Sequence, residues 1–197
     1  GTIIDAPDYD IVNVLRPQGG GIDMGAYESP SENIWYVDTS RADDSGDGLS
    51  WSTAKHTIQA ANSLATSGDE VWVAEGTYTN NGGGTATVLV MKEGVGYYGG
   101  FQGGETVRTE RDPQAYTTTL DGEDTAYHVV EGASNAVLDG FTVTRGNASG
   151  IGTNEWGGGM FCDSIINITI HNSRFVSNWG QEGGGLFCHE TTLNIIM

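Results

Sequence analysis

Apolar and polar residues alternate at every second position in the C-terminal half of the chain. Residues 166–170 read Ile-Asn-Ile-Thr-Ile, and residues 193–195 read Leu-Asn-Ile. A period of two, many β-branched residues and breaks rich in glycine indicate short β-strands. The alternation therefore predicts an all-β protein over most of its length.

One segment has the spacing of a helix instead. Between residues 54 and 65 the apolar positions recur every three or four residues, which places Ala54, Ile58, Ala61, Leu64 and Ala65 on one stripe. We expect Ser52 or Thr53 to cap the start of this helix and Gly68 to end it. If the strands form a stack of coils, the first coil exposes unpaired backbone groups and an apolar interior. We therefore predict that the helix lies across the first coil as a cap.

A hexapeptide occurs twice. Gly-Gly-Gly-Met-Phe-Cys at 157–162 returns as Gly-Gly-Gly-Leu-Phe-Cys at 183–188, an offset of 26 residues. Asn147 and Asn178 precede the two copies and are 31 residues apart, and the loops between Asn and glycines differ by five residues. Short repeats with loops of variable length predict a solenoid. With several strands in each repeat, the solenoid is a parallel β-helix whose coils stack about 4.8 Å apart.

Charge and hydropathy limit the partners of the chain. The 197 residues contain 8 Lys and Arg against 26 Asp and Glu, a net charge of -18, which excludes electrostatic attraction to nucleic acids or anionic membranes. No run of 18 apolar residues occurs, so we expect no membrane span. Low lysine content, many Gly, Thr and Asn residues and the acidic balance are typical of extracellular proteins. We expect a secreted or cell-surface protein whose export signal lies outside this sequence.

A short polar linker, Ser-Pro-Ser-Glu-Asn at residues 29–33, divides the chain. We interpret residues 1–28 as one unit. The second unit then consists of an N-terminal cap with the first coils, residues 34–116, and regular coils over residues 117–197, which end in mid-strand.

Several motifs of the second unit follow one another in a specific order. They are Trp35-Tyr36-Val37-Asp38, Gly46-Asp47-Gly48-Leu49-Ser50-Trp51, Gly68-Asp69-Glu70-Val71-Trp72-Val73-Ala74-Glu75-Gly76-Thr77-Tyr78, Tyr98-Gly99-Gly100-Phe101 and Leu120-Asp121-Gly122. This order resembles the N-terminal capping region of right-handed parallel β-helix proteins with a pectin-lyase-like fold, and the later repeats resemble those of polymorphic outer-membrane proteins. The resemblance implies a secreted or surface-anchored bacterial protein. It does not imply an activity, because the fold hosts lyases, hydrolases, adhesins and inert stalks.

The first unit resembles a different part of such proteins. Ile4-Asp5-Ala6, Arg16-Pro17-Gln18-Gly19 and the segment 22–28 are similar to the last coil of a β-helix. An ending motif thus precedes a beginning motif. Two interpretations remain open: the chain joins two β-helices in tandem, or residues 1–28 dock on the open end of a neighbouring copy and give head-to-tail fibres.

Two pairs of repeated residues have a structural interpretation. Asn147 and Asn178 fall at the same point of successive coils, where a stacked asparagine ladder satisfies backbone groups more often than asparagine binds a ligand. Cys162 and Cys188 also recur, and stacking brings them within reach of a disulfide. Free, stacked thiols are the favoured interpretation, and the disulfide stays open.

Two further groups are candidates for ligand binding. Asp38, Asp43, Asp44 and Asp47 surround glycines in one loop, which makes a calcium site possible, although a solvated acidic loop is favoured because no Glu stands at the twelfth position. No other cofactor is expected. Trp156 and Trp179 precede the two triple glycines, where they form either a sugar-stacking platform or a hydrophobic lid over the coil edge.

Signals for catalysis are few. Asp121, Asp139 and Asp163 could share a face only if their coils are in register, and the basic residues of the regular coils form no known motif: His128, Arg145, His171, Arg174 and His189. The sequence therefore favours a structural or adhesive module that can associate with itself or with a polysaccharide. The alternative is a polysaccharide-binding or polysaccharide-degrading β-helix, lyase or hydrolase, whose active residues lie outside this sequence.

Overall fold

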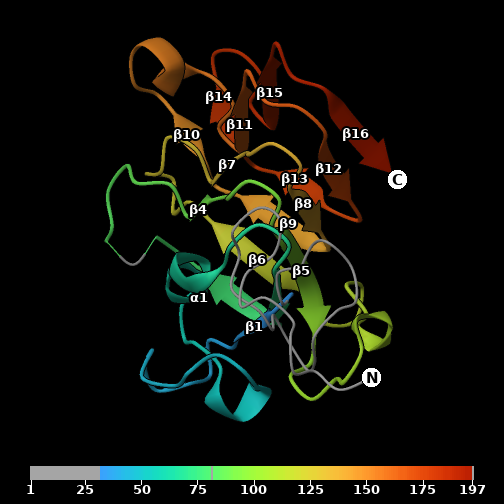
Figure 1. Ribbon diagram of the computed structural model, residues 1–197. Coiled ribbons are helices and arrows are strands. Elements are labelled where there is room, and N and C mark those ends of the chain that lie inside the picture. Colours follow the sequence, from blue (N-terminus) through green and yellow to red (C-terminus); the bar gives the residue numbers. More distant parts are fainter. Residues whose placement is uncertain (1–31, 81, 197) are drawn as a thin grey trace, which may run out of the picture. The chain divides into compact units, whose positions relative to one another are not determined.

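The computed structural model describes residues 32–80 and 82–196. The described part contains sixteen short strands, three short 3-10 helices and one α-helix, α1 (Ile58–Leu64). All strand pairings among these residues are parallel (Figure 1). The predicted all-β architecture with parallel strands and one helix is therefore confirmed.

The strands form three main sheets. Sheet 1 has the order β1 (Ile34–Val37), β2 (Glu70–Ala74), β5 (Gly96–Phe101), β8 (Val137–Asp139), β12 (Ile168–His171) and β16 (Leu193–Ile196). Sheet 2 contains β3 (Gly76–Tyr78), β6 (Thr118–Asp121), β9 (Phe141–Thr144) and β13 (Arg174–Val176). Sheet 3 contains β4 (Leu89–Val90), β7 (Val130–Glu131), β11 (Met160–Asp163) and β15 (Leu186–His189). A further pair is formed by β10 (Asn147–Ala148) and β14 (Trp179–Gly180).

The chain visits these sheets in a constant order. From β2 onward it passes through sheet 1, then sheet 2, then sheet 3, and returns to sheet 1, so each round adds one strand to each sheet. We call one such round a coil. The two copies of the hexapeptide stack in register, with Met160 opposite Leu186 and Phe161 opposite Phe187. The offset of 26 residues seen in the sequence is thus the distance between paired positions of β11 and β15.

Apolar side chains that face inward from the three sheets form one core. Its fully buried members include Val71, Leu89, Tyr97, Leu120, Leu138, Phe141, Met160 and Ile168. Ile168 and Ile170 occupy the buried positions that the alternation predicts, whereas Ile166 precedes β12 and is 54% exposed. The alternation therefore begins two residues later than its sequence pattern.

The predicted helix over residues 54–65 is shorter than expected. Ser50 caps a 3-10 turn at Trp51–Thr53, and the chain becomes extended at Ala54 before Thr57 caps α1 through a bond from the Ala60 amide. The prediction of Ser52 or Thr53 as the cap is therefore wrong. The expected stripe is also imperfect, because Leu64 is 41% exposed while the neighbouring Ala61 and Ala65 are buried.

The two faces of α1 have different partners. Ile58 and Ala61 pack into the core with Val37 of β1. On the polar face, Gln59 donates to the carbonyl oxygens of Thr79 and Val88, and Asn62 donates to that of Val90. The helix thereby covers apolar side chains and also supplies donors to the residue before β4 and to β4 itself, the edge strand of sheet 3 among the described residues.

Some predictions fall outside the described residues. The interpretation of residues 1–28 as the last coil of another β-helix, and most of the linker 29–33, belong to this group. Within residues 32–80 and 82–196, no helix has the length and apolar character that are needed to cross a membrane.

Candidate functional site: the groove beside Asp139

Asp139 lies at the end of β8, on the outer side of sheet 1. Its neighbour Leu138 points into the core, so the alternation of the strand turns the carboxylate outward. In the register of sheet 1, Asp139 stands between Tyr98 of β5 and His171 of β12. Asp139 is nevertheless only 6% exposed, because the loop between β5 and β6 lies over it.

Three side chains contact this carboxylate. Arg111 donates from Nη2 to Oδ2 over 2.5 Å, and the Nδ2 of Asn172 donates to Oδ1 over 3.0 Å. The Nδ1 of His171 lies 3.4 Å from Oδ2. Arg111 also donates from Nη1 to the carbonyl oxygen of Gly99 over 2.9 Å. The arrangement fixes the loop that carries Arg111 to three successive strands of sheet 1.

The turn after Asp139 requires a glycine. Gly140 has a φ of +86°, and a Cβ atom at this position would lie 2.6 Å from Nη1 of Arg111 and 2.8 Å from the carbonyl oxygen of Gly99. A larger residue would displace the guanidinium group. The tight turn between β8 and β9 and the position of Arg111 are therefore coupled.

The same loop packs on aromatic residues of sheet 1. The guanidinium carbon of Arg108 lies 4.3 Å from the ring centroid of Tyr98, and that of Arg111 lies 5.6 Å away. Arg108 also pairs with Glu70, which accepts a hydrogen bond from the indole of Trp72 over 2.6 Å. Burial, and then the charge of Glu70, raise the pKa of Tyr98. Tyr98 is thus a neutral packing surface for the two arginines.

A groove of about 590 Å³ opens next to this cluster. The loop segment 111–117 lines one side, and the ends of β9, β12 and β13 line the other. Four polar side chains in the lining make no hydrogen bond within the described residues, namely Gln114, Thr117, Thr142 and Arg174. The lining also includes Ile195 of β16, so the groove lies beside the last described strands of sheets 1 and 2.

The two predicted ladder asparagines are not stacked on each other. Asn147 pairs in register with Trp179, so Asn178 stands opposite Gly146 instead, and the expected stack is wrong by one residue. The Oδ1 of Asn178 accepts the amide of Gly146 over 2.9 Å, and its Nδ2 donates to the carbonyl oxygen of Val143 over 2.9 Å. Asn147 donates only to the carbonyl oxygen of Asp124. Both side chains satisfy backbone groups, and Asn178 does so between two coils.

Cys162 and Cys188 are register partners on β11 and β15. Both thiols are free in this structure. Burial raises the pKa of both thiols, more strongly for Cys162. Neither thiol lies in an environment that would stabilise a nucleophilic thiolate.

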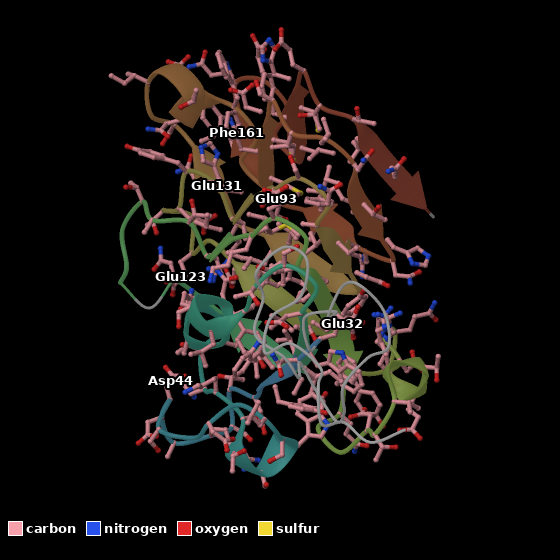
Figure 2. All side chains as sticks on the ribbon, in the orientation of Figure 1. Glu32, Asp44, Glu93, Glu123, Glu131 and Phe161 are labelled. Atoms are coloured by element: carbon pink, nitrogen blue, oxygen red, sulfur yellow. The ribbon has the colours of Figure 1, made fainter. Side chains whose placement is uncertain are left out.

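The four candidate calcium ligands hold their own loop and do not converge. Asp38 pairs with Arg41, Asp43 accepts the amide of Ser45, and Asp47 accepts the amide of Leu49 together with the hydroxyl of Thr53. Asp44, labelled in Figure 2, accepts the amide and the hydroxyl of Thr57, the capping residue of α1. The described residues contain no group of three or more side chains that could hold a metal ion. The acidic loop is therefore explained by turns and by the helix start.

Trp156 and Trp179 also have separate partners. Trp156 stacks on Phe187, with ring centroids 5.0 Å apart, whereas Trp179 is 51% exposed and has no ring partner among the described residues. The two tryptophan rings make no ring contact with each other among the described residues, and the choice between a sugar platform and a hydrophobic lid stays a prediction. Phe187 in turn stacks on Phe161 at 5.8 Å, and Phe161 stacks on His128 at 4.9 Å. The sequence reasoning missed this column, although both phenylalanines belong to the repeated hexapeptide.

The column lies on the outer side of sheet 3. Phe161 of β11 stands in register with Glu131 of β7, and both side chains are labelled in Figure 2. Because the rings face one another along the stacking direction, their faces are largely occupied within the column. Its arrangement favours cohesion between coils over ligand binding.

The three aspartates considered for catalysis belong to three different sheets. Asp139 is in sheet 1. Asp121 of sheet 2 binds Arg145 through both carboxylate oxygens, at 2.7 and 2.5 Å. Asp163 of sheet 3 lies 2.8 Å from Nδ1 of His189. They do not share a face, and each binds a basic side chain from another coil.

Comparison with known protein families gives one match. The family described as "Protein of unknown function (DUF1565)" matches residues 41–195, which include nearly all the described strands. No curated protein and no solved structure matched the chain. The chain therefore belongs to the DUF1565 family.

Proposed function

We propose that this chain is a structural and adhesive module of a secreted or cell-surface bacterial protein. In this proposal the three parallel sheets wind as a right-handed parallel β-helix, and α1 is the N-terminal cap. The constant order of sheets supports the winding, because each coil contacts mainly its neighbours. The bonds from Gln59 and Asn62 to the edge of sheet 3 support the capping role.

One observation carries the proposal: the charged side chains connect coils. Asp139 binds Arg111 from the preceding coil, Asp121 binds Arg145 from the following coil, and Asp163 binds His189 from the following coil. A glycosidase needs two carboxylates facing one bond, about 5–10 Å apart. Here the carboxylates are distributed over three sheets, and each is bound by a basic side chain. This use of charge suits a rigid scaffold better than a hydrolytic site.

The proposal is tested with the full chain coupled to beads. The beads are mixed with purified bacterial and plant polysaccharides, and both retention and chain cleavage are measured. We expect retention of at least one polysaccharide without new reducing ends or the absorbance of unsaturated sugars. Cleavage would support the alternative, a polysaccharide-degrading enzyme, and retention of no polysaccharide would argue against adhesion.

Self-association is tested separately. The proposed module includes head-to-tail contacts between copies, which do not close and therefore give masses that grow with concentration. Light scattering over a concentration series measures this growth. A constant mass of one chain at all concentrations contradicts self-association and leaves the adhesive role to other partners.

A further inference from the structure

The first strand of sheet 2, β3, is paired on one side only. Its partner is β6, and the amide of Gly76 donates to the carbonyl oxygen of Thr117 just before β6. Successive residues of a parallel strand direct their backbone groups to opposite sides, so Thr77 and Thr79 face away from β6. The bond from Gln59 of α1 to the carbonyl oxygen of Thr79 agrees with this direction.

Three backbone groups on the free side of β3 have no hydrogen-bond partner among residues 32–80 and 82–196. They are the amide and the carbonyl of Thr77 and the amide of Thr79. The side chain of Thr77 is exposed, so this edge is open to a partner from solution. The strand therefore presents main-chain donors and an acceptor at the spacing that a further strand requires.

The opening is a property of the coil that precedes β3. After β1, the chain forms loops, a 3-10 turn and α1 before it reaches β2, and it contributes no earlier strand to sheets 2 and 3. Lys55 pairs with Val37 and so covers the outer edge of β1. Gln59 and Asn62 of α1 donate to the edge of sheet 3. This segment thus satisfies the first strands of sheets 1 and 3 and leaves β3 open at Thr77.

A polar notch of about 140 Å³ lies along the free edge. One wall is β3 with the residue that follows it, and the other wall comes from the loop before α1 and from its first turn: Thr39, His56, Thr57 and Gln59. The hydroxyl groups of Thr39, Thr77 and Thr79 make no hydrogen bond in the described part. A segment that pairs with β3 would therefore meet polar groups on both sides.

We propose that the free edge of β3 binds an extended, basic peptide segment of a partner protein, which adds one strand to sheet 2. Strand addition satisfies unpaired edge groups with main-chain hydrogen bonds. A helix cannot do so, because its backbone groups are already bonded within the helix. The inference goes beyond the adhesive function proposed above, because it names a second kind of partner and a different part of the chain.

The charge beside the notch favours basic residues in the peptide. Glu75 directly precedes β3, is exposed and makes no ion pair in the described part. Asp43 is also exposed and interacts electrostatically with His56 in the notch wall. Arg41 is already paired with Asp38. In a chain of net charge -18, these carboxylates attract a basic segment and repel an acidic one.

Fluorescence polarisation of labelled peptides with the full chain tests the proposal. The probe is the acetylated and amidated peptide Lys-Val-Thr-Val-Lys. One control peptide has N-methyl groups on its second and third residues, which block strand pairing in either register, and another has Glu in place of both Lys. The protein variants are Thr77→Pro, which removes the free amide, the matched control Thr77→Val, which keeps it, and Glu75→Gln.

We expect the basic peptide to bind, and the methylated peptide to bind about tenfold more weakly or not at all. Thr77→Pro should cause a similar loss, whereas Thr77→Val should leave binding unchanged. Because the amide of Thr77 faces away from β6, proline keeps the pairing with β6, and circular dichroism checks that the variant is folded. Glu75→Gln should weaken binding about twofold, and added salt should weaken it further.

Amide hydrogen exchange of the wild-type protein gives a readout that needs no variant. Exchange at Thr77 should be fast in the free protein and at least about tenfold slower with saturating basic peptide, while Leu120 of β6 should not change. No binding of the basic peptide, equal binding of the methylated peptide, or unchanged exchange at Thr77 would overturn the proposal. Equal binding of the Glu peptide would overturn the assigned charge of the partner.

The adhesive function fails or stands independently of this edge. Beads that carry Thr77→Pro should retain the same polysaccharides as wild-type beads, because the peptide site is separate. If Thr77→Pro abolishes polysaccharide retention and the basic peptide does not bind, the notch is a glycan site and strand addition is wrong. If the peptide binds and no polysaccharide is retained, the adhesive function alone is contradicted.

Discussion

Arg111 and Asp139 form an ion pair in which both side chains are nearly buried, at 11% and 8% exposure. The two residues are 28 positions apart, and their contact fixes the loop between β5 and β6 to the outer side of sheet 1. Since Asn172 shares the same carboxylate, the pair also joins the loop to the turn that follows β12. The groove takes its shape from this contact, because Arg111 itself is part of the lining.

Asp139→Asn should destabilise the protein by about 3 kcal/mol, because it leaves the buried guanidinium group of Arg111 without a counter-charge. Urea denaturation followed by circular dichroism measures the loss. The matched control is Asp43→Asn, which alters an exposed turn and should leave the midpoint of unfolding nearly unchanged. If the two variants are equally stable, the ion pair does not hold the loop.

Asn178→Ala should cost about 2 kcal/mol. The substitution removes two hydrogen bonds between coils and takes away the side-chain acceptor of the Gly146 amide. Asn147→Ala is the matched control, with an expected loss of about 0.5 kcal/mol, because its one side-chain bond to Asp124 is exposed. Thermal unfolding of both variants is the measurement. A larger effect at Asn147 would contradict the assigned difference.

The position of Asn178 also explains part of the repeated glycine motif. A Cβ atom on Gly159 would lie 2.7 Å from Nδ2 of Asn178 and 2.3 Å from the carbonyl oxygen of Gly185. Glycine at this point lets the asparagine reach between coils. The spacing of the repeated motif alone could not identify this partner.

The sequence predicted local structure better than contacts between distant segments. The alternation at Ile168 and Ile170 identified a buried strand, since burial on one face imposes a period of two. The helix start was misplaced because the 3-10 turn at Trp51–Thr53 also satisfies a capping pattern, through Ser50. The true cap, Thr57, is held by Asp44, thirteen residues earlier. Such a contact depends on how a loop folds back, which sequence periodicity does not contain.

The groove could not be predicted for the same reason. Its two sides come from segment 111–117 and from β9, β12 and β13, and nothing in their spacing shows that they meet.

Phe187→Leu should destabilise the protein by about 1 kcal/mol through loss of its ring stacking with Phe161 and Trp156. The change keeps an apolar side chain of similar volume, so the loss reports mainly on stacking. Near-ultraviolet circular dichroism should show a weaker tryptophan signal as Trp156 loses its partner. Val90→Ala, on the outer side of the same sheet, should leave that signal intact. An unchanged spectrum in Phe187→Leu would contradict the stacked column.

Alkylation should distinguish the two cysteines. Both thiols have raised pKa values, with the stronger effect of burial at Cys162. In the native protein at pH 8, iodoacetamide should therefore modify the exposed Cys188 slowly and Cys162 only after unfolding. Mass spectrometry without reductant measures both steps. Failure of either cysteine to react after unfolding without reductant would show a disulfide and contradict the free thiols.

The pair of Asp163 and His189 should make stability depend on pH. The hydrogen bond with Asp163 raises the pKa of His189 above 6.5, and the same bond lowers the pKa of Asp163 below 3.8. The contribution of His189 is complete below pH 6.5 and is lost as the pH rises through its folded pKa. The contribution of Asp163 is present above pH 3.8 and is lost as the pH falls through its folded pKa. The pair therefore stabilises the fold most between pH 3.8 and pH 6.5.

Nuclear magnetic resonance titration of His189 checks this dependence. In Asp163→Asn, the pKa of His189 should fall towards 6.5, because its acceptor loses the negative charge. Asp124→Asn, which removes an exposed carboxylate near Arg145, is the control and should leave the titration of His189 unchanged. The same His189 pKa in wild type and Asp163→Asn would show that the bond between β11 and β15 is absent in solution. Because the pair is exposed, its loss should flatten the pH profile of unfolding without preventing folding.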